Sequence, residues 1–392
     1  MAPSPTQPVF SREHRVLALL LIFVPLSFVA GRVGWPPALQ FFLSVAAVVP
    51  LAAFIGTSTE ALADRFGGKV GGLLNATFGN APDLLIGVFG VQKGLIPLVK
   101  ATLVGALISN SALIMGVCCV AAGLLYGGPR FKLEEAGHHS VLMMLTLAAV
   151  VFPSVGAIVL CGEVQCVRQS DASTILHASV GISVVLLIAY AAYVAYAIFG
   201  WKRLRPADIR TPPQAGAREL PVRVNWSPGL AGAVLALSTA ALIPVTDILT
   251  GSVDPVTHVL GWTQVFVGIV IVANAGNAAE AYAAIRFAVS RGGIDPSKGD
   301  SGLDLALGIA SASSVQIATF VAPVVVLYSL FGHHMNLVFS PVELSILALL
   351  TLIFSYICHD GESNWLEGVQ LLALYAMAGV VFYTLPVNVF AG

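Results

Sequence analysis

Two short motifs each place an amide and a carboxylate within a segment that is otherwise apolar. The first motif, GNAPD, runs from Gly79 to Asp83, and the second motif, GNAAE, runs from Gly276 to Glu280, 197 residues further on. In both, the asparagine and the acid are three residues apart, so a helix would turn their side chains to the same face. Ionisable side chains in apolar spans are costly to bury and usually mark the path of an ion.

The side chains of the two motifs predict a cation site built from oxygen atoms alone. Asp83 and Glu280 supply carboxylates, Asn80 and Asn277 supply amides, and Pro82 interrupts the helical hydrogen bonding that would otherwise occupy backbone carbonyls. This ligand set suits calcium or a similar hard cation, and not zinc or copper. The same carboxylates would hold protons once the metal leaves, because desolvation favours the neutral acid. Competition between a metal and protons for one site is the simplest basis of antiport.

Further oxygen ligands are expected from a segment that follows each motif. GALISN, from Gly105 to Asn110, and GIASASSVQ, from Gly308 to Gln316, carry serines and amides at loosely matching places. The full set of predicted metal-binding residues is Gly79, Asn80, Asp83, Ser109, Asn110, Gly276, Asn277, Glu280, Ser313, Ser314 and Gln316. A plainer alternative is that the two motif asparagines only cap broken helices or join neighbouring helices by hydrogen bonds.

The composition of the chain indicates an all-α polytopic membrane protein. Of its 392 residues, 57% are hydrophobic and only 10% are charged, against about 25% charged residues in soluble domains. Spans of about 20 apolar residues cross a bilayer, and the alternating pattern of barrel strands is absent. We predict 11 transmembrane helices, near residues 15–31, 38–59, 71–92, 98–126, 140–160, 174–200, 229–250, 264–289, 303–331, 337–358 and 366–386.

A polar segment divides these spans into two sets. Residues 202–226 hold six basic residues and four prolines, which is typical of a cytoplasmic linker. We therefore predict an N-terminal tail and first helix in 1–33, a five-helix repeat in 34–201, the linker, and a second five-helix repeat in 227–392. Because each repeat contains an odd number of spans, the two repeats would have opposite orientations in the membrane.

The distribution of basic residues predicts the orientation, since cytoplasmic loops attract Lys and Arg. With the N-terminus in the cytoplasm, 15 of the 19 basic residues fall in cytoplasmic segments, and the C-terminus lies outside. Short loops and one short linker favour the inner membrane of a prokaryote. The net charge of −1 and the lack of a large extramembrane domain argue against a nucleic-acid partner.

The two sets of spans repeat their polar pattern in the same order. STEALADRFG, from Ser58 to Gly67, matches SVDPVTHVLG, from Ser252 to Gly261, in its serine, acid and glycine positions. The GNAPD and GNAAE motifs follow, and the serine and amide segments come after them. Inverted repeats with interrupted polar helices at matching positions indicate a secondary transporter with its site near the membrane midplane.

Together with three further stretches, the two motifs resemble the cation/proton exchangers of the calcium/cation antiporter superfamily. These stretches are LLNATFGNA from Leu73, SSVQIATFVAP from Ser313 and DGESNWLEG from Asp360. The resemblance covers nearly all of residues 38–386. It implies one leading helix followed by two inverted five-helix repeats, and the exchange of cytoplasmic calcium for external protons.

The resemblance also implies roles for individual residues. The two essential acids of the family fall on Asp83 and Glu280, with Asn80, Asn277 and Gln316 nearby in the ion pathway. No cofactor is implied, because calcium and protons are the transported substrates. The lipid bilayer is the one further partner, and the oligomeric state stays open.

The chain departs from the family pattern in both motifs. The first motif usually has Thr or Val followed by Glu, whereas Pro82 and Asp83 stand here. Asp is shorter than Glu by one carbon–carbon bond, roughly 1.5 Å, which leaves room for a water or a different ion unless the helices move closer. The second motif usually continues with His, and Ala281 stands there, so one possible proton carrier is lost.

Three other functions stay open beside calcium/proton exchange. Sodium-coupled exchange, or exchange of another cation, is the nearest rival. An intramembrane enzyme could use paired acids to activate water, but no GxSxG or HExxH motif is present, and we expect no enzymatic activity. A passive channel would need an open hydrophilic lining, whereas the polar residues here cluster at one level.

The five cysteines show no metal-binding spacing. Cys118 and Cys119 lie in a predicted span, where they are expected to pack as apolar residues. Cys161 and Cys166 flank an outward loop, and a disulfide between them is possible in an oxidising compartment. The sequence alone leaves that bond undecided.

Overall fold

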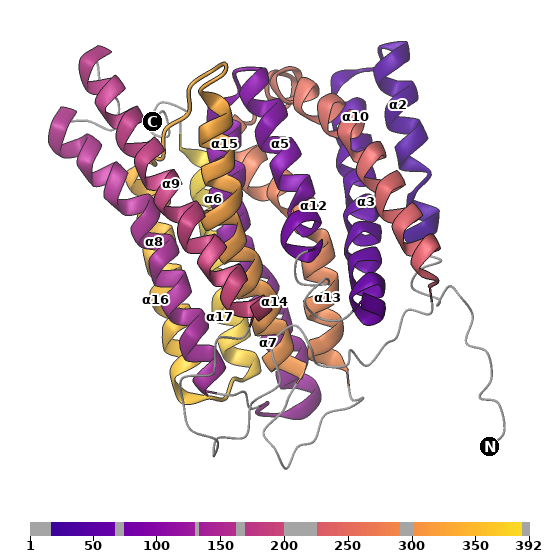
Figure 1. The fold of residues 1–392 in the computed structure, drawn as a ribbon, viewed down its shortest axis with the longest axis vertical. Coiled ribbons are helices and arrows are strands. Elements are labelled where there is room, and N and C mark those ends of the chain that lie inside the picture. The colour runs from indigo at the N-terminus through magenta and orange to yellow at the C-terminus, as the bar shows by residue number, and fades with distance from the viewer. Residues whose placement is uncertain are drawn as a thin grey trace.

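The computed structural model describes residues 17–66, 74–129, 133–161, 169–199, 226–290 and 302–385. Within these ranges the chain forms helices joined by short connections and contains no β-strand, so the predicted all-helical class is confirmed. Figure 1 shows the long helices standing side by side in one bundle. Residues 202–225 of the predicted linker lie outside the described residues.

The helices follow one another in nearly the same order on either side of the linker. The elements before it are α2 (Phe23–Val33), α3 (Pro37–Phe66), η1 (Asn75–Gly79), α5 (Ala81–Gln92), α6 (Ile96–Ile108), η2 (Ser109–Ile114), α7 (Met115–Tyr126), α8 (Leu133–Cys161) and α9 (Gln169–Phe199). The elements after it are α10 (Pro228–Leu260), α11 (Gln264–Phe266), η4 (Val267–Val272), α12 (Ala273–Gly276), α13 (Ala278–Val289), α14 (Gly302–Gln316), η6 (Ile317–Val321), α15 (Ala322–Ser329), α16 (Pro341–Asp360) and α17 (Trp365–Thr384). Helices α3 and α10 continue beyond the predicted ends of their spans at residues 59 and 250, because polar residues can still form the hydrogen bonds of a helix.

The described residues contain seven helices that are long and apolar enough to cross a membrane, or eight if one bent pair counts as a span. The bent pair is Gln264–Gly276 with Ala278–Val289, and its two parts meet at an angle of 61°. The shorter apolar helices are Leu17–Val33, Ala81–Gln92 and Pro341–Ile357. The chain is therefore a membrane protein with several helical spans.

Within the described residues, four wider, π-helical turns interrupt the regular α-helices. η1 comes directly before the first motif, and η4 lies one turn before the second. η2 separates α6 from α7, and η6 separates α14 from α15. Single π-helical turns inside α-helices are frequent at functional sites. Their positions lie next to the polar segments that the sequence singles out.

Two groups of helices flank the interrupted segments. Helices α2, α3 and α10 pack together on one side of the bundle in Figure 1, and α8, α9 and α16 stand on the opposite side. An apolar core fills the contact of α3 with α10, with Val48 and Leu249 fully buried in it. A second core surrounds α6 and includes Leu107. The interrupted helices lie between two close-packed flanks.

Small residues let the backbones of α6 and η4 touch. A methyl group at Gly105 would lie 2.5 Å from the Cα atom of Ile269, and one at Gly268 would lie 3.0 Å from the carbonyl oxygen of Leu98. The first distance is shorter than real Cβ contacts, and the methyl group at Gly268 would also lie 2.8 Å from the Cβ atom of Ala101, so glycine suits both positions. This contact brings the polar residues of η2 close to those of α12.

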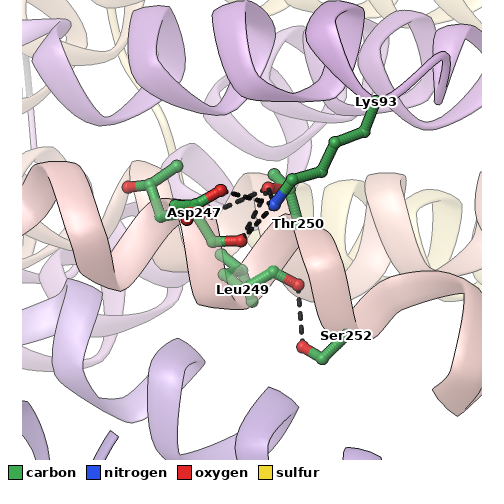
Figure 2. A network of polar contacts seen from close by, with 6 residues as sticks. Lys93, Asp247, Leu249, Thr250 and Ser252 are labelled. Atoms are coloured by element: carbon green, nitrogen blue, oxygen red, sulfur yellow. Dashed lines mark hydrogen bonds and ion pairs between the residues drawn. The ribbon is translucent and has the colours of Figure 1, made fainter. Parts of the chain in front are cut away.

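Lys93, at the end of α5, fastens that helix to α10. Its ammonium lies 2.7 Å from the Oδ1 atom of Asp247 and donates hydrogen bonds to the Thr250 hydroxyl, at 3.0 Å, and to the carbonyl oxygen of Asp247. Figure 2 shows the lysine reaching across the gap between the two helices to this group of oxygens. The contact joins a helix before the linker to one after it.

Lys100 in α6 forms hydrogen bonds to the segment that connects α15 and α16. The side chain is 5% exposed and donates to Asn336 Oδ1, at 2.7 Å, and to the carbonyl oxygen of Val338, at 2.8 Å. The hydroxyl of Ser154 accepts the backbone N–H of Phe339 at 2.9 Å, so α8 holds the same segment. A buried lysine without such acceptors would be strongly destabilising.

The cysteines agree with the sequence where the structure describes them. Cys118 and Cys119 are free and fully buried in an apolar core, as predicted. Cys161 is disulfide-bonded. Cys166 lies outside the described residues, so the question of its pairing with Cys161 stays as the sequence leaves it.

Candidate functional site

Both motifs break their helices at the asparagine. Asn80, between η1 and α5, has φ −96° and ψ 16°, and Asn277, between α12 and α13, has φ −81° and ψ 8°. These values fall in the sparsely populated bridge region, where many active-site residues lie. A glycine precedes each asparagine, and Pro82 in the first turn of α5 lacks the N–H that would continue the hydrogen-bond ladder. The same local sequence therefore gives the same break in two distant parts of the chain.

Each break places its acid in the first turn of the helix that follows. Asp83 is the third residue of α5 and is 5% exposed, and Glu280 is the third residue of α13 and is partly buried. The helix dipole favours a negative charge at this end. The two carboxylates are close enough to interact electrostatically.

Asp83 also touches the second motif directly. A methyl group added to Gly276 would lie 2.6 Å from the Oδ1 atom of Asp83. This distance is shorter than any ordinary contact, so the carboxylate lies against the bare backbone of Gly276. Gly79, at the same place in the first motif, is the last residue of η1. The two motifs thus lie against each other.

The asparagines of the two breaks form hydrogen bonds that cross between the parts of the chain. Asn80 donates from Nδ2 to the Oε1 atom of Gln316, at 2.6 Å. Asn277 donates from Nδ2 to the Oδ1 atom of Asn110, at 3.2 Å, and to the carbonyl oxygen of Ala106, at 3.3 Å. Neither side chain caps its own helix. Each break is tied to an amide that comes from the other side of the linker.

The serines of the predicted set have different surroundings. Ser313 accepts a hydrogen bond from the Nδ2 atom of Asn110, at 3.0 Å, and so extends the cluster around Asn277. Ser109 donates to the Oδ1 atom of Asn274, at 2.6 Å. Ser314 instead donates to the carbonyl oxygen of Ala310 in its own helix, at 3.0 Å.

Two polar residues of this region are missing from the set predicted from sequence. Asn274 lies in α12, three residues before Asn277, and its Nδ2 atom donates to the hydroxyl of Tyr375 in α17, at 2.6 Å. The sequence carries a signal for Asn274, since it is an amide in an apolar span with the helical spacing of the motif. Nothing in the local sequence distinguishes Tyr375 from other aromatic residues of its span.

Three oxygens at the site have no hydrogen-bond partner within the part of the chain that the structure describes. They are Oδ1 of Asp83, Oδ1 of Asn277 and Oε2 of Glu280, and each is shielded from solvent. Buried polar atoms are nearly always paired, so unpaired ones need an explanation such as a bound ion. In the described ranges no group of three or more His, Cys, Asp or Glu side chains could hold a metal. Any cation bound here would need neutral oxygens as well as the two carboxylates.

The arrangement can bind a hard cation and exchange it for protons. Calcium takes six to eight oxygen ligands, which carboxylates, side-chain amides, hydroxyls and backbone carbonyls can all supply. An isolated buried carboxylate is costly unless a cation or a proton neutralises it. An all-helical membrane protein whose broken helices meet around such a site has the features of a secondary ion transporter.

Comparison with known proteins identifies the family of transporters to which the chain belongs. The chain belongs to the family described as sodium/calcium exchanger protein, whose sequence model matches residues 36–199 and 230–384. The family resemblance inferred from the two motifs is therefore confirmed. The family consists of transporters, so the expectation that the chain is no enzyme is confirmed as well.

Curated relatives match over almost the whole chain. A Ca(2+)/H(+) antiporter of Synechocystis is 34% identical over 383 residues, which cover 96% of this chain and 99% of the relative. The Ca(2+)/H(+) antiporter ChaA of Bacillus subtilis is 34% identical over 364 residues, which cover 92% of this chain and 97% of the relative.

Solved structures show the same fold. The structure of native YfkE superimposes with a TM-score of 0.76 at 32% identity, and the match covers 94% of this chain and all of YfkE. An H+/Ca2+ exchanger named CAX matches with a TM-score of 0.65, covering 95% of this chain and 92% of the exchanger, but with 15% identity. This second likeness concerns the fold alone.

Proposed function

We propose that the protein is a secondary active antiporter that exchanges cytoplasmic calcium for protons by alternating access. Asp83 and Glu280 bind calcium in one half of the transport cycle and protons in the other half. Other groups supply neutral oxygens or hold the ligands in place: the side chains of Asn80, Asn277, Asn110, Ser109, Ser313 and Gln316, and the carbonyls near Gly79 and Gly276. Ser314 belongs to the same proposed set, since its hydroxyl donates its one hydrogen to Ala310 within its own helix and its oxygen lone pairs are not used by that bond.

The single observation that carries this proposal is the set of three buried oxygens without protein partners. Two of them belong to the carboxylates of facing helix breaks, and the third belongs to the amide of Asn277. A cation bound among them would satisfy all three at once, and two protons would neutralise the two acids. The names of the full-length relatives support calcium and protons as the substrates.

Binding in alternation follows from the charges. With both acids ionised and no cation present, two like charges would face each other in a buried place, which is costly. Calcium removes this repulsion by binding both, and protons remove it by neutralising each acid. The protein therefore passes through its occluded state only when loaded with one substrate or the other.

We further propose eleven transmembrane helices, one leading helix in 1–33 and two inverted five-helix repeats in 34–201 and 227–392. The eight candidate spans and the three shorter apolar helices of the described residues occupy the eleven predicted positions, which supports this count. The charge pattern supports a cytoplasmic N-terminus, a cytoplasmic linker in 202–226 and an external C-terminus. The bacterial relative ChaA supports a location in a prokaryotic cell membrane.

Everted membrane vesicles with an acid interior test the proposal. Ca²⁺, Mg²⁺, Mn²⁺, Na⁺ and K⁺ are added separately, and a fluorescent indicator follows the collapse of the pH gradient. We expect calcium to collapse the gradient, and Asp83→Asn and Glu280→Gln each to abolish that response in protein that is still inserted. A response to another cation but not to calcium would show that Asp83 and Ala281 have changed the substrate. No response to any cation would refute proton coupling.

A further inference from the structure

The side-chain amide of Asn274 bonds to three different elements beside the candidate site. Its Nδ2 atom donates to the carbonyl oxygen of Val270 in η4, at 2.7 Å, and to the hydroxyl of Tyr375 in α17, at 2.6 Å. Its Oδ1 atom accepts from the hydroxyl of Ser109 in η2, at 2.6 Å. Both N–H groups and one oxygen lone pair are thus used.

These partners fix which way the amide faces. If the amide were turned over, its oxygen would lie at 2.7 Å from the carbonyl oxygen of Val270, and two acceptors would repel each other. Oδ1 therefore faces Ser109. An amide oxygen has no hydrogen, so the hydrogen in this contact must come from the hydroxyl of Ser109.

We infer that Asn274 and Tyr375 are positioning residues: they hold the hydroxyl hydrogen of Ser109 in a hydrogen bond, so that the oxygen of Ser109 can bind a cation only through its lone pairs. A serine hydroxyl has one hydrogen and two lone pairs. Asn274 takes up the hydrogen, and the lone pairs are left for a cation. Ser109 is fully buried and directly precedes Asn110, which bonds to Asn277 of the second motif. This inference rests on the proposed function, because it names how one ligand of the same cation site is oriented.

Tyr375 completes the arrangement from the last described helix. Without its hydroxyl the second N–H of Asn274 would lose its acceptor, and the amide would be freer to turn away from Ser109. The first motif has no amide at the matching position. The residue that corresponds to Asn274 in the first motif, 197 positions earlier, is Thr77, which is exposed and has no amide.

Calcium-dependent transport separates a positioning role from a purely structural one. Asn274→Leu keeps the size of the side chain and removes every hydrogen bond, and Tyr375→Phe removes one hydroxyl. We expect Asn274→Leu to raise the KM for calcium roughly five- to tenfold, the worth of about one hydrogen bond, with a smaller change in Vmax. Tyr375→Phe should raise the KM about two- to fivefold.

A double-mutant cycle tests whether the effect passes through Ser109. Ser109→Ala should raise the KM by about as much as Asn274→Leu, and the double variant should be no worse than Ser109→Ala alone. Tyr328→Phe is the matched control, because it removes a tyrosine hydroxyl that accepts an amide N–H of Gln92, also at 2.6 Å, at an exposed place. Its KM should equal that of the wild type.

A second readout keeps this inference apart from the proposed function. The rise in unfolding temperature that calcium chloride causes in purified protein reports binding without transport. If wild-type protein is stabilised by calcium but moves no protons, the antiport proposal fails. The double-mutant cycle is then evaluated from the calcium-induced rise in unfolding temperature instead of the KM. The positioning role would be overturned if the KM increases of Ser109→Ala and Asn274→Leu multiplied in the double variant. It would also be overturned if Asn274→Leu and Tyr375→Phe kept the calcium dependence of the wild type. Wild-type protein that calcium neither drives nor stabilises would overturn both.

Discussion

A methyl group at Gly276 would push directly on the carboxylate of Asp83. The added carbon would lie 2.6 Å from Oδ1, so the carboxylate must retreat by about 0.8 Å to reach an ordinary contact of about 3.4 Å. Calcium–oxygen bonds are only about 2.3–2.6 Å long, so a shift of this size removes the oxygen from the coordination shell. The backbone of Gly276 is helical, and alanine is itself a good helix former. Gly276→Ala is therefore a substitution aimed at one ligand.

We expect Gly276→Ala to weaken calcium binding about 10- to 100-fold, the usual cost of misplacing a metal ligand. The KM for calcium in everted vesicles measures this effect, and the calcium-induced rise in unfolding temperature measures it independently of transport. The unfolding temperature without calcium should change little.

Two other glycines provide controls for this experiment. A methyl group at Gly123 would lie 2.4 Å from the backbone nitrogen of Trp365, so Gly123→Ala introduces a similar clash between α7 and α17. It should lower the unfolding temperature and leave the KM of the surviving protein unchanged. A methyl group at Gly181 would meet nothing within 4 Å, so Gly181→Ala should change neither quantity. If Gly276→Ala kept the wild-type KM, the contact of Asp83 with the second motif would have no part in calcium binding.

Three further substitutions test how the helices are held together, each by thermal unfolding in detergent. Lys93→Met removes a partly exposed ion pair to α10 and should cost less than about 1 kcal/mol, so a loss above about 2 kcal/mol would contradict our view of that contact. Lys100→Met leaves the Val338 carbonyl unpaired and Glu343 without its nearby cation, and should cost about 3 kcal/mol; adding Glu343→Gln should recover part of it. Ser340→Ala removes the N-cap of α16 and should cost about 1 kcal/mol, and no measurable loss would argue against the capping box.

The sequence was sufficient to predict the elements that carry the site. Hydropathy marks the spans because the bilayer demands apolar residues of a set length, and this signal is local. The two helix breaks could also be predicted, since glycine, proline and asparagine act on the backbone next to them. The contact of Asp83 with the second motif follows only if the two motifs meet, which the repetition of the motif suggested.

The contacts that complete the site could not be predicted in the same way. Asn80 bonds to Gln316, 236 residues away, and Asn274 bonds to Tyr375, 101 residues away. Such pairs depend on how the helices pack, and neither partner changes the local pattern of its own span. The hydroxyl of Ser314 donates its hydrogen to the carbonyl oxygen of Ala310 within its own helix, a contact that the local sequence does not show, and its place among the ligands stays a prediction.

The π-helical turns also change how residue directions in the membrane helices must be assigned. A regular helix turns by about 100° per residue, and a π-helical turn takes up about one residue more than an α-helical one. A helical wheel drawn from Ile96 through η2 would therefore place every residue after Ile114 about 100° from its true direction. A scan of substitution tolerance along residues 96–126 should follow one period up to Ile108, slip by one position, and resume from Met115. Lipid-facing and buried positions in each interrupted helix have to be assigned separately on the two sides of its π-helical turn.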